Sequence, residues 1–184
     1  AGVQVGTLRN VKIWVGGAGA TLATASFVPP DPELVPELLE TLLSEWRYFF
    51  DVLTKAPASE KLSAITKFHH RFLSIHPFVD GNGRIARFLL TQHARELFDQ
   101  KRRVFIDDRL PYFQALSEAD QGNYSALEAQ ISQAIFGVEF VPGSPCQMSG
   151  QQCPSCREGG MDVAPGETGV TCSTCGLFIP AIES

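Results

Sequence analysis

One short stretch of the sequence, residues 76–87, gathers the residue types that phosphate chemistry requires. It reads His-Pro-Phe-Val-Asp-Gly-Asn-Gly-Arg-Ile-Ala-Arg. His76 can accept a proton near neutral pH, and the carboxylate of Asp80 can hold a hard cation such as Mg²⁺. Gly81 and Gly83 leave backbone N–H groups open to an anion. Together these residues indicate a site for the phosphates of a nucleotide.

The stretch should lie between two helices. Pro77 disfavours helical geometry at the residue before it, so the preceding helix is expected to stop at His76. Glycines and an asparagine at 81–83 turn the chain, and an apolar pattern then predicts a helix from Arg84 to about Phe98. The N-terminus of that helix can bind an anion through its backbone N–H groups and its dipole.

Two arginines, Arg84 and Arg87, are spaced three apart at the start of this helix. They would project from one side of it, and each could grip phosphate oxygens with a planar fork of donors. Taken singly, a histidine beside proline is more often a helix cap, and an Asp-Gly-Asn-Gly string is more often an ordinary turn. The joint spacing of all these residues favours the interpretation as a phosphate-binding site.

The elements before the motif are expected to position it. Residues 11–15 and 21–28 are compatible with strands, and the glycines between them predict a β-hairpin. The residues alone favour an edge hairpin over the core rather than a flap over a cleft. Asp31 is a suitable cap for a helix with a leucine-rich face, and Ser59 for the next one, whose apolar stripe runs to Ile75.

Composition and charge exclude several classes of protein. Hydrophobic residues make up 44% and charged residues 19% of the 184 residues, which is typical of a globular protein rather than a disordered one. No apolar run reaches the roughly 20 residues that a membrane span needs. The net charge of -5 weighs against broad nucleic-acid binding, which normally requires an excess of Lys and Arg.

All five cysteines lie after residue 145. Two Cys-x-x-Cys pairs follow a linker rich in Pro, Gly and Ser at 138–152, and they consist of Cys153, Cys156, Cys172 and Cys175. Four thiolates in two such pairs can close a tetrahedron around Zn²⁺. We therefore expect a zinc ribbon, with two disulfides or a redox pair as less favoured alternatives. Cys146 is left over.

The motif at 76–87 resembles the signature of the Fic family, because it matches that signature at every position. The flanks at 6–15, 27–30 and 112–116 are also similar to the family. The resemblance implies a mainly α fold, a Fic-type helical bundle with an N-terminal β-hairpin flap at about 11–28. With the C-terminal zinc ribbon, the expected domains are 1–137 for the Fic domain, 138–152 for the linker and 153–184 for the ribbon.

The resemblance also implies a reaction, the transfer of AMP from ATP to a Ser, Thr or Tyr hydroxyl of a target protein. His76 would be the base, and Asp80 would hold Mg²⁺. Phosphate binding would fall to the remaining residues of the motif: the backbone N–H groups of Gly81, Asn82 and Gly83, the Asn82 side chain at the α-phosphate, and the side chains of Arg84 and Arg87. The hairpin would align the target, which moves the balance toward a flap.

Further expectations concern regulation, alternative functions and cellular location. No segment matches the family's inhibitory helix, so that helix would be absent, supplied by a partner, or encoded before Ala1. A rival function is a nucleotide-binding module that recruits a protein or nucleic acid through the zinc ribbon; another is a Fic enzyme with a different donor, such as UTP. The expected setting is the cytoplasm, with self-modification as a further reaction.

Overall fold

The computed structural model describes residues 6–17, 19–101, 104–106 and 109–137, with the backbone alone at Arg109 and in three strands near the C-terminus. These residues are mainly helical, as predicted. The helices are α1 (Val35–Lys55), α2 (Ala58–Ile75), α3 (Asn82–Phe98), α4 (Arg109–Asp120) and α5 (Ser125–Phe136), with short 3-10 helices at Leu22–Thr24 and Pro32–Leu34.

The strands near the C-terminus are β1 (Met161–Val163), β2 (Gly169–Cys172) and β3 (Phe178–Pro180). They form an antiparallel sheet in the order β1-β2-β3, with Met161 opposite Cys172 and Val170 opposite Ile179. Among the helices of the described part of the chain, none has both the length and the apolar character that a membrane crossing requires.

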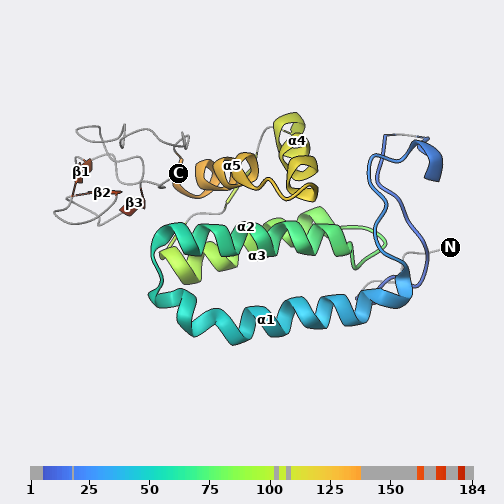
Figure 1. Ribbon diagram of the computed structural model, residues 1–184, viewed down its shortest axis with the longest axis horizontal. Helices are drawn as coiled ribbons and strands as arrows, with labels where there is room; N and C mark the ends of the chain where they lie inside the picture. Colours follow the sequence, from blue (N-terminus) through green and yellow to red (C-terminus); the bar gives the residue numbers. More distant parts are fainter. Residues whose placement is uncertain are drawn as a thin grey trace.

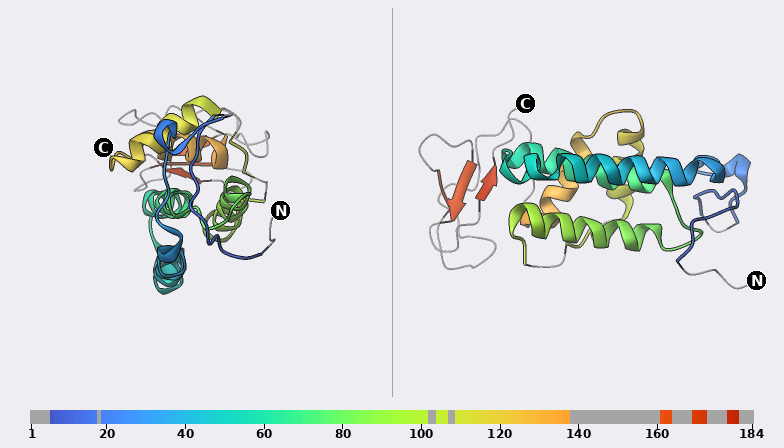
Figure 2. Two further views of the ribbon diagram at one scale, coloured as in Figure 1. Left: turned by 90° about the vertical axis from the view of Figure 1, so that its right-hand side faces the viewer. Right: turned by 90° about the horizontal axis from the view of Figure 1, so that it is seen from below.

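Helices α1, α2 and α3 lie side by side as three long rods, and α4 and α5 cover α2 from the opposite side to α1 (Figure 1). The views in Figure 2 show the N-terminal segment, residues 6–17 and 19–34, at the end of the bundle where α2 passes into α3. The motif stretch therefore lies at one end of the bundle, where the N-terminal segment covers it.

The apolar stripe of α2 joins two clusters of buried side chains. Phe68, Phe72 and Ile75 pack with Val35 and Leu42 of α1 in the first cluster. Leu62 and Ile65 pack with residues of α3, α4 and α5 in the second, namely Leu90, Ala94, Ala115, Ala119, Leu127, Ile131 and Ile135. The stripe predicted for this helix is confirmed, and it makes α2 the central element of the bundle.

The helix starts differ from the predictions. Asp31 makes no side-chain capping bond, because its carboxylate is paired with Lys12 at 2.8 Å. Helix α2 begins at Ala58 after Pro57, so Ser59 lies inside the first turn and not at the cap. Asp31 thus holds the predicted position at the start of the helical segment without the predicted capping bond, whereas the cap predicted at Ser59 was wrong.

The predicted hairpin at 11–28 does not form as a pair of strands in the described residues of this segment. Its two arms share one antiparallel bridge, between Val15 and Phe27, where the Val15 N–H donates to the Phe27 carbonyl at 2.9 Å. Residues 22–24 form a 3-10 turn instead of continuing the second strand. The strand propensity of the two arms thus produces pairing only between Val15 and Phe27 in the described residues of this segment.

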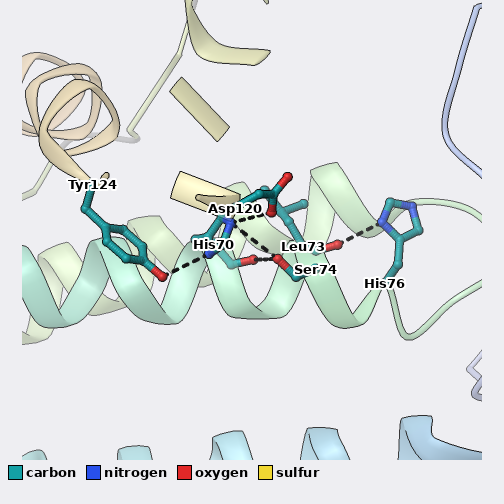
Figure 3. A network of polar contacts seen from close by, with 6 residues as sticks. All are labelled: His70, Leu73, Ser74, His76, Asp120 and Tyr124. Carbon is teal, nitrogen blue, oxygen red and sulfur yellow. Dashed lines mark hydrogen bonds and ion pairs between the residues drawn. The ribbon is translucent and has the colours of Figure 1, made fainter. Parts of the chain in front are cut away.

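Three histidines lie inside the bundle. His69 contacts the Tyr112 hydroxyl through Nε2 at 2.6 Å, and the ring of His93 stacks on Trp46 with centroids 4.0 Å apart. His70 is bonded at both ring nitrogens, to the Asp120 carboxylate at 2.8 Å and the Tyr124 hydroxyl at 3.2 Å (Figure 3). The contacts of His69 and His70 fasten α4 and the start of α5 to α2, and the stacking of His93 on Trp46 joins α3 to α1, so the three histidines have a structural role.

We expect the free energy of unfolding to fall as the pH is lowered from about 6.5 to about 4. Burial lowers the pKa of His69 and of His93 to about 4, whereas both titrate near the ordinary histidine value in the unfolded chain. Each therefore contributes stability that is fully present above the unfolded pKa and is lost through this window, at a slope of up to about 1.4 kcal/mol per pH unit. Urea unfolding at a series of pH values measures this decrease in the free energy of unfolding.

The matched control is His93→Phe, which keeps an aromatic ring against Trp46 and Phe68 and removes the titrating nitrogens. Carboxylates titrate equally in both proteins, so the difference between the two curves isolates one histidine. The variant should lose stability less steeply over the same pH range. Parallel curves for the wild type and the variant would contradict this account.

Candidate active site

The motif loop runs from the end of α2 to the start of α3 and is closed by one side chain. Asn82 is only 2% exposed. Its Oδ1 accepts the Phe78 N–H at 2.9 Å, and its Nδ2 donates to the Phe78 carbonyl at 2.7 Å. Phe78 in turn packs against the apolar cluster between α1 and α2. The loop is therefore held in shape by its own backbone and anchored in the core.

His76 ends α2 in the left-handed region, with φ 50° and ψ 60°. Its Nδ1 lies 3.0 Å from the Leu73 carbonyl (Figure 3). A carbonyl only accepts, so Nδ1 carries the proton, and Nε2 holds the lone pair of the neutral ring. Burial lowers the pKa of His76, the bond to Leu73 raises it and the charge of Arg9 lowers it. The neutral ring, able to act as a base at Nε2, is thus the stable form at pH 7.

Asp80 and Arg84 face each other on the outer side of the loop. The carboxylate accepts the Gly81 N–H through Oδ1 at 2.6 Å and lies 3.4 Å from Arg84 Nη2 through Oδ2. Both side chains are about three-quarters exposed, at 74% and 76%. They are open to solvent, and a ligand can reach both.

Arg87 occupies the inner side. A Cβ placed on Gly83 would lie 3.3 Å from Arg87 Nη1, so the guanidinium group crosses directly over that glycine. Burial raises the pKa of the nearby Tyr112 phenol, and the positive charge of Arg87 opposes this shift. The two arginines therefore lie over the two glycines of the motif, with Arg84 over Gly81 and Arg87 over Gly83.

Helix α3 begins at Asn82, two residues before the predicted start at Arg84. Its first N–H groups, at 82–84, have no acceptor within the helix and are oriented for an anion. The Asn82 side chain, which is expected to reach the α-phosphate, bonds to Phe78 with one hydrogen bond at each of its two polar atoms, and its second amide N–H takes no part in these bonds.

The residues fit a single magnesium ion held jointly with phosphates. Mg²⁺ commonly takes one or two carboxylates plus substrate phosphate oxygens and water. Asp80 supplies one exposed carboxylate, and no group of three or more His, Cys, Asp or Glu side chains gathers within the described residues. The cysteines predicted to bind zinc, Cys153, Cys156, Cys172 and Cys175, lie outside the described side chains.

Sequence reasoning missed Arg9. Its side chain is 3% exposed, and its Nε donates to the His76 carbonyl at 2.8 Å. Nothing in the sequence signals this contact, because the two residues are 67 positions apart and Arg9 belongs to an ordinary polar stretch.

Gly81→Ala should destabilise the folded state by about 1–2 kcal/mol, since an L-residue is strained in the left-handed region. Gly81 has φ +86°, and an added Cβ would also meet Arg84 Nη2 at 3.4 Å. Gly83→Ala is the matched control. Its φ is not positive, and the nearest atom to the new Cβ is the far end of a flexible arginine. Thermal unfolding should therefore show a drop only for Gly81→Ala; an equal drop in both would contradict the backbone argument.

Comparison with known proteins identifies relatives of this chain. The Fic/DOC family profile matches residues 2–94, just over half of the chain. A probable protein adenylyltransferase of Aquifex aeolicus is 35% identical over 108 residues, which cover 56% of this chain and 30% of the relative. Protein adenylyltransferases of Caenorhabditis elegans and Caenorhabditis briggsae are 29% and 30% identical, over 66% and 77% of this chain.

The chain spans less than a third of the length of these relatives, with 21% of the C. elegans protein and 27% of the C. briggsae protein covered. The matched part contains the N-terminal segment, α1, α2, the motif loop and most of α3. The chain belongs to the Fic/DOC family.

Proposed function

We propose that the chain is a protein adenylyltransferase, which transfers AMP from ATP to a Ser, Thr or Tyr hydroxyl of a target protein. The observation that carries the proposal is the Nε2 lone pair of His76 at the start of the loop that leads into the N-terminus of α3. A base and a phosphate cradle thus share one loop. The names of the three relatives support the same reaction.

The reaction balances with these groups. The hydroxyl oxygen of the target attacks the α-phosphorus, and its proton passes to His76 Nε2. The bond between the α-phosphorus and the oxygen that bridges to the β-phosphate breaks. Pyrophosphate leaves with the electron pair of that bond, and the target keeps AMP. The lowered pKa of His76 supports this role, because the ring is then neutral before the reaction.

The phosphates would lie along the start of α3. The N–H groups of Gly81, Asn82 and Gly83 would surround the α-phosphate, while Arg84 holds the β- and γ-phosphates and Arg87 braces the γ end. For Gly81 this requires its N–H to leave Asp80 Oδ1. Mg²⁺, when bound at Asp80, would neutralise charge on the leaving pyrophosphate.

The remaining parts of the proposal concern organisation. Residues 1–137 would form the Fic domain, and residues 11–28 would align the target over the loop as a flap. Support for its position comes from Arg9, just before the segment, which bonds to the carbonyl of Pro30, just after the segment, and to the carbonyl of His76 in the motif. ATP is the proposed donor, with UTP as the alternative.

His76→Ala should lower AMP transfer by about 10²–10⁴-fold, because the attacking hydroxyl loses its base. The measurement is the transfer of label from α-labelled ATP with Mg²⁺ to proteins of a cell lysate, and to the chain itself. His93→Phe serves as the matched histidine control, since that ring lies in the core against Trp46, and it should keep the wild-type rate at pH 7.5.

Two outcomes would overturn the proposal in different ways. Equal labelling by the wild type and His76→Ala would remove His76 as the base. Retention of ATP binding without any transfer, to targets or to the chain itself, would favour the nucleotide-binding module. A parallel assay with α-labelled UTP distinguishes the donors.

We also propose that residues 153–184 form a zinc ribbon behind a linker at 138–152. The spacing of Cys153, Cys156, Cys172 and Cys175 supports this, because two Cys-x-x-Cys pairs supply the four soft ligands that structural zinc takes. A short segment of this kind has too little apolar surface to fold without such a crosslink. The ribbon would serve to dock the target or another partner.

Metal analysis of protein purified without chelator should find about one zinc per chain. Cys153→Ser together with Cys156→Ser should abolish zinc binding, because only two thiolates would remain. Cys146→Ser is the matched control, as this cysteine stands outside both pairs, and it should leave the zinc content unchanged. Wild-type protein free of zinc would remove the proposal.

A further inference from the structure

Arg9 is a buried cation whose acceptors are backbone carbonyls. Its side chain is 3% exposed. Nε donates to the His76 carbonyl at 2.8 Å, and Nη2 donates to the carbonyls of Pro30 at 2.6 Å and Ile75 at 3.3 Å. Nη1 adds the Val11 carbonyl at 3.3 Å. Burying a guanidinium group costs free energy unless every donor is satisfied. A set of acceptors as specific as this one therefore calls for an explanation.

Two of those carbonyls, at Ile75 and His76, belong to the end of α2. The last carbonyls of a helix have no donor within the helix, and a cation at that end is favourable. Arg9 supplies both the donors and the charge. Its own backbone N–H donates to the Pro77 carbonyl at 2.9 Å, so the residue holds three successive carbonyls, those of Ile75, His76 and Pro77.

These bonds from Arg9 hold the loop at a strained residue, His76. His76 has φ 50°, a conformation that is costly for a residue with a side chain and that persists only where the surroundings hold it. The same backbone geometry puts Nδ1 of the ring within 3.0 Å of the Leu73 carbonyl. If the His76–Pro77 peptide turns, that bond is lost, and the direction of Nε2 is lost with it.

We infer that Arg9 is a positioning residue for His76: by holding the carbonyls of His76 and Pro77 it fixes the tautomer and the direction of the imidazole. The inference deepens the proposed function and rests on it for the catalytic consequence. The charge of Arg9 acts in the same sense, because it lowers the pKa of His76 and so favours the neutral ring. The structural consequence, a fixed ring, can be tested without any activity.

The test compares Arg9→Met, which keeps an apolar stem and removes charge and donors, with Arg9→Lys, which keeps the charge on one nitrogen. Lys12→Met is the matched control. It removes an exposed ion pair with Asp31 in the same segment and leaves the His76 peptide untouched. Circular dichroism and thermal unfolding establish that each variant is folded.

The first readout is the nitrogen NMR spectrum of the His76 ring, assigned by its absence in His76→Gln. Wild type and Lys12→Met should show a ring protonated at Nδ1, whereas Arg9→Met should show mixed tautomers and a raised pKa. Arg9→Lys should keep the pKa and lose the single tautomer, because one ammonium group cannot span the carbonyls of Pro30 and His76. Wild-type ring spectra in both Arg9 variants would overturn the inference, whatever the activity.

The second readout is AMP transfer. Arg9→Met should lower kcat by about 10–100-fold with KM for ATP nearly unchanged, since the ring is misdirected while the phosphate cradle is intact. The acid limb of its pH profile should move to higher pH. Should Arg9→Met fail to fold, Arg9→Lys decides: a folded Arg9→Lys with wild-type tautomer and kcat overturns the inference. A wild type without transfer would refute the proposed function alone, because the ring spectra still test Arg9.

Discussion

The structure depends on one reversal of the chain, between the end of α2 and the start of α3. Asn82 closes the reversal through two hydrogen bonds to Phe78, and Pro77, at the start of the loop, is fully buried. This closure fixes the path of the loop from Phe78 to Asn82. Without it, the ends of the two helices would have no common geometry, and a base and an anion site could not be held in one loop.

Much of this arrangement could be predicted from the sequence because it depends on local rules. Pro77 ends the first helix, and the stripe from Leu62 to Ile75 marks its buried face. These are effects of neighbouring residues on one another, and the sequence states them directly. The position of His76 at the end of a helix follows from the same rules.

The parts that could not be predicted depend on partners distant in the sequence. Asp31 has the chemistry of a helix cap, but Lys12 takes its carboxylate. Residues 21–28 have the propensity for a strand, but only Phe27 finds a partner. In each case the chemistry was assigned correctly, and the competing partner lay beyond the reach of any local pattern.

The pairing of Asp80 with Arg84 has a consequence for the order in which ligands arrive. An exposed ion pair of this kind contributes little stability, so it opens readily once a competitor for either charge is present. A free divalent cation would have to displace an arginine, and a free anion would have to displace a carboxylate. Under the proposed function, a cation already bound to a polyphosphate would carry both competitors at once and would exchange with the pair without leaving an unbalanced charge. Asp80 and Arg84 would then receive the two parts of one ligand together.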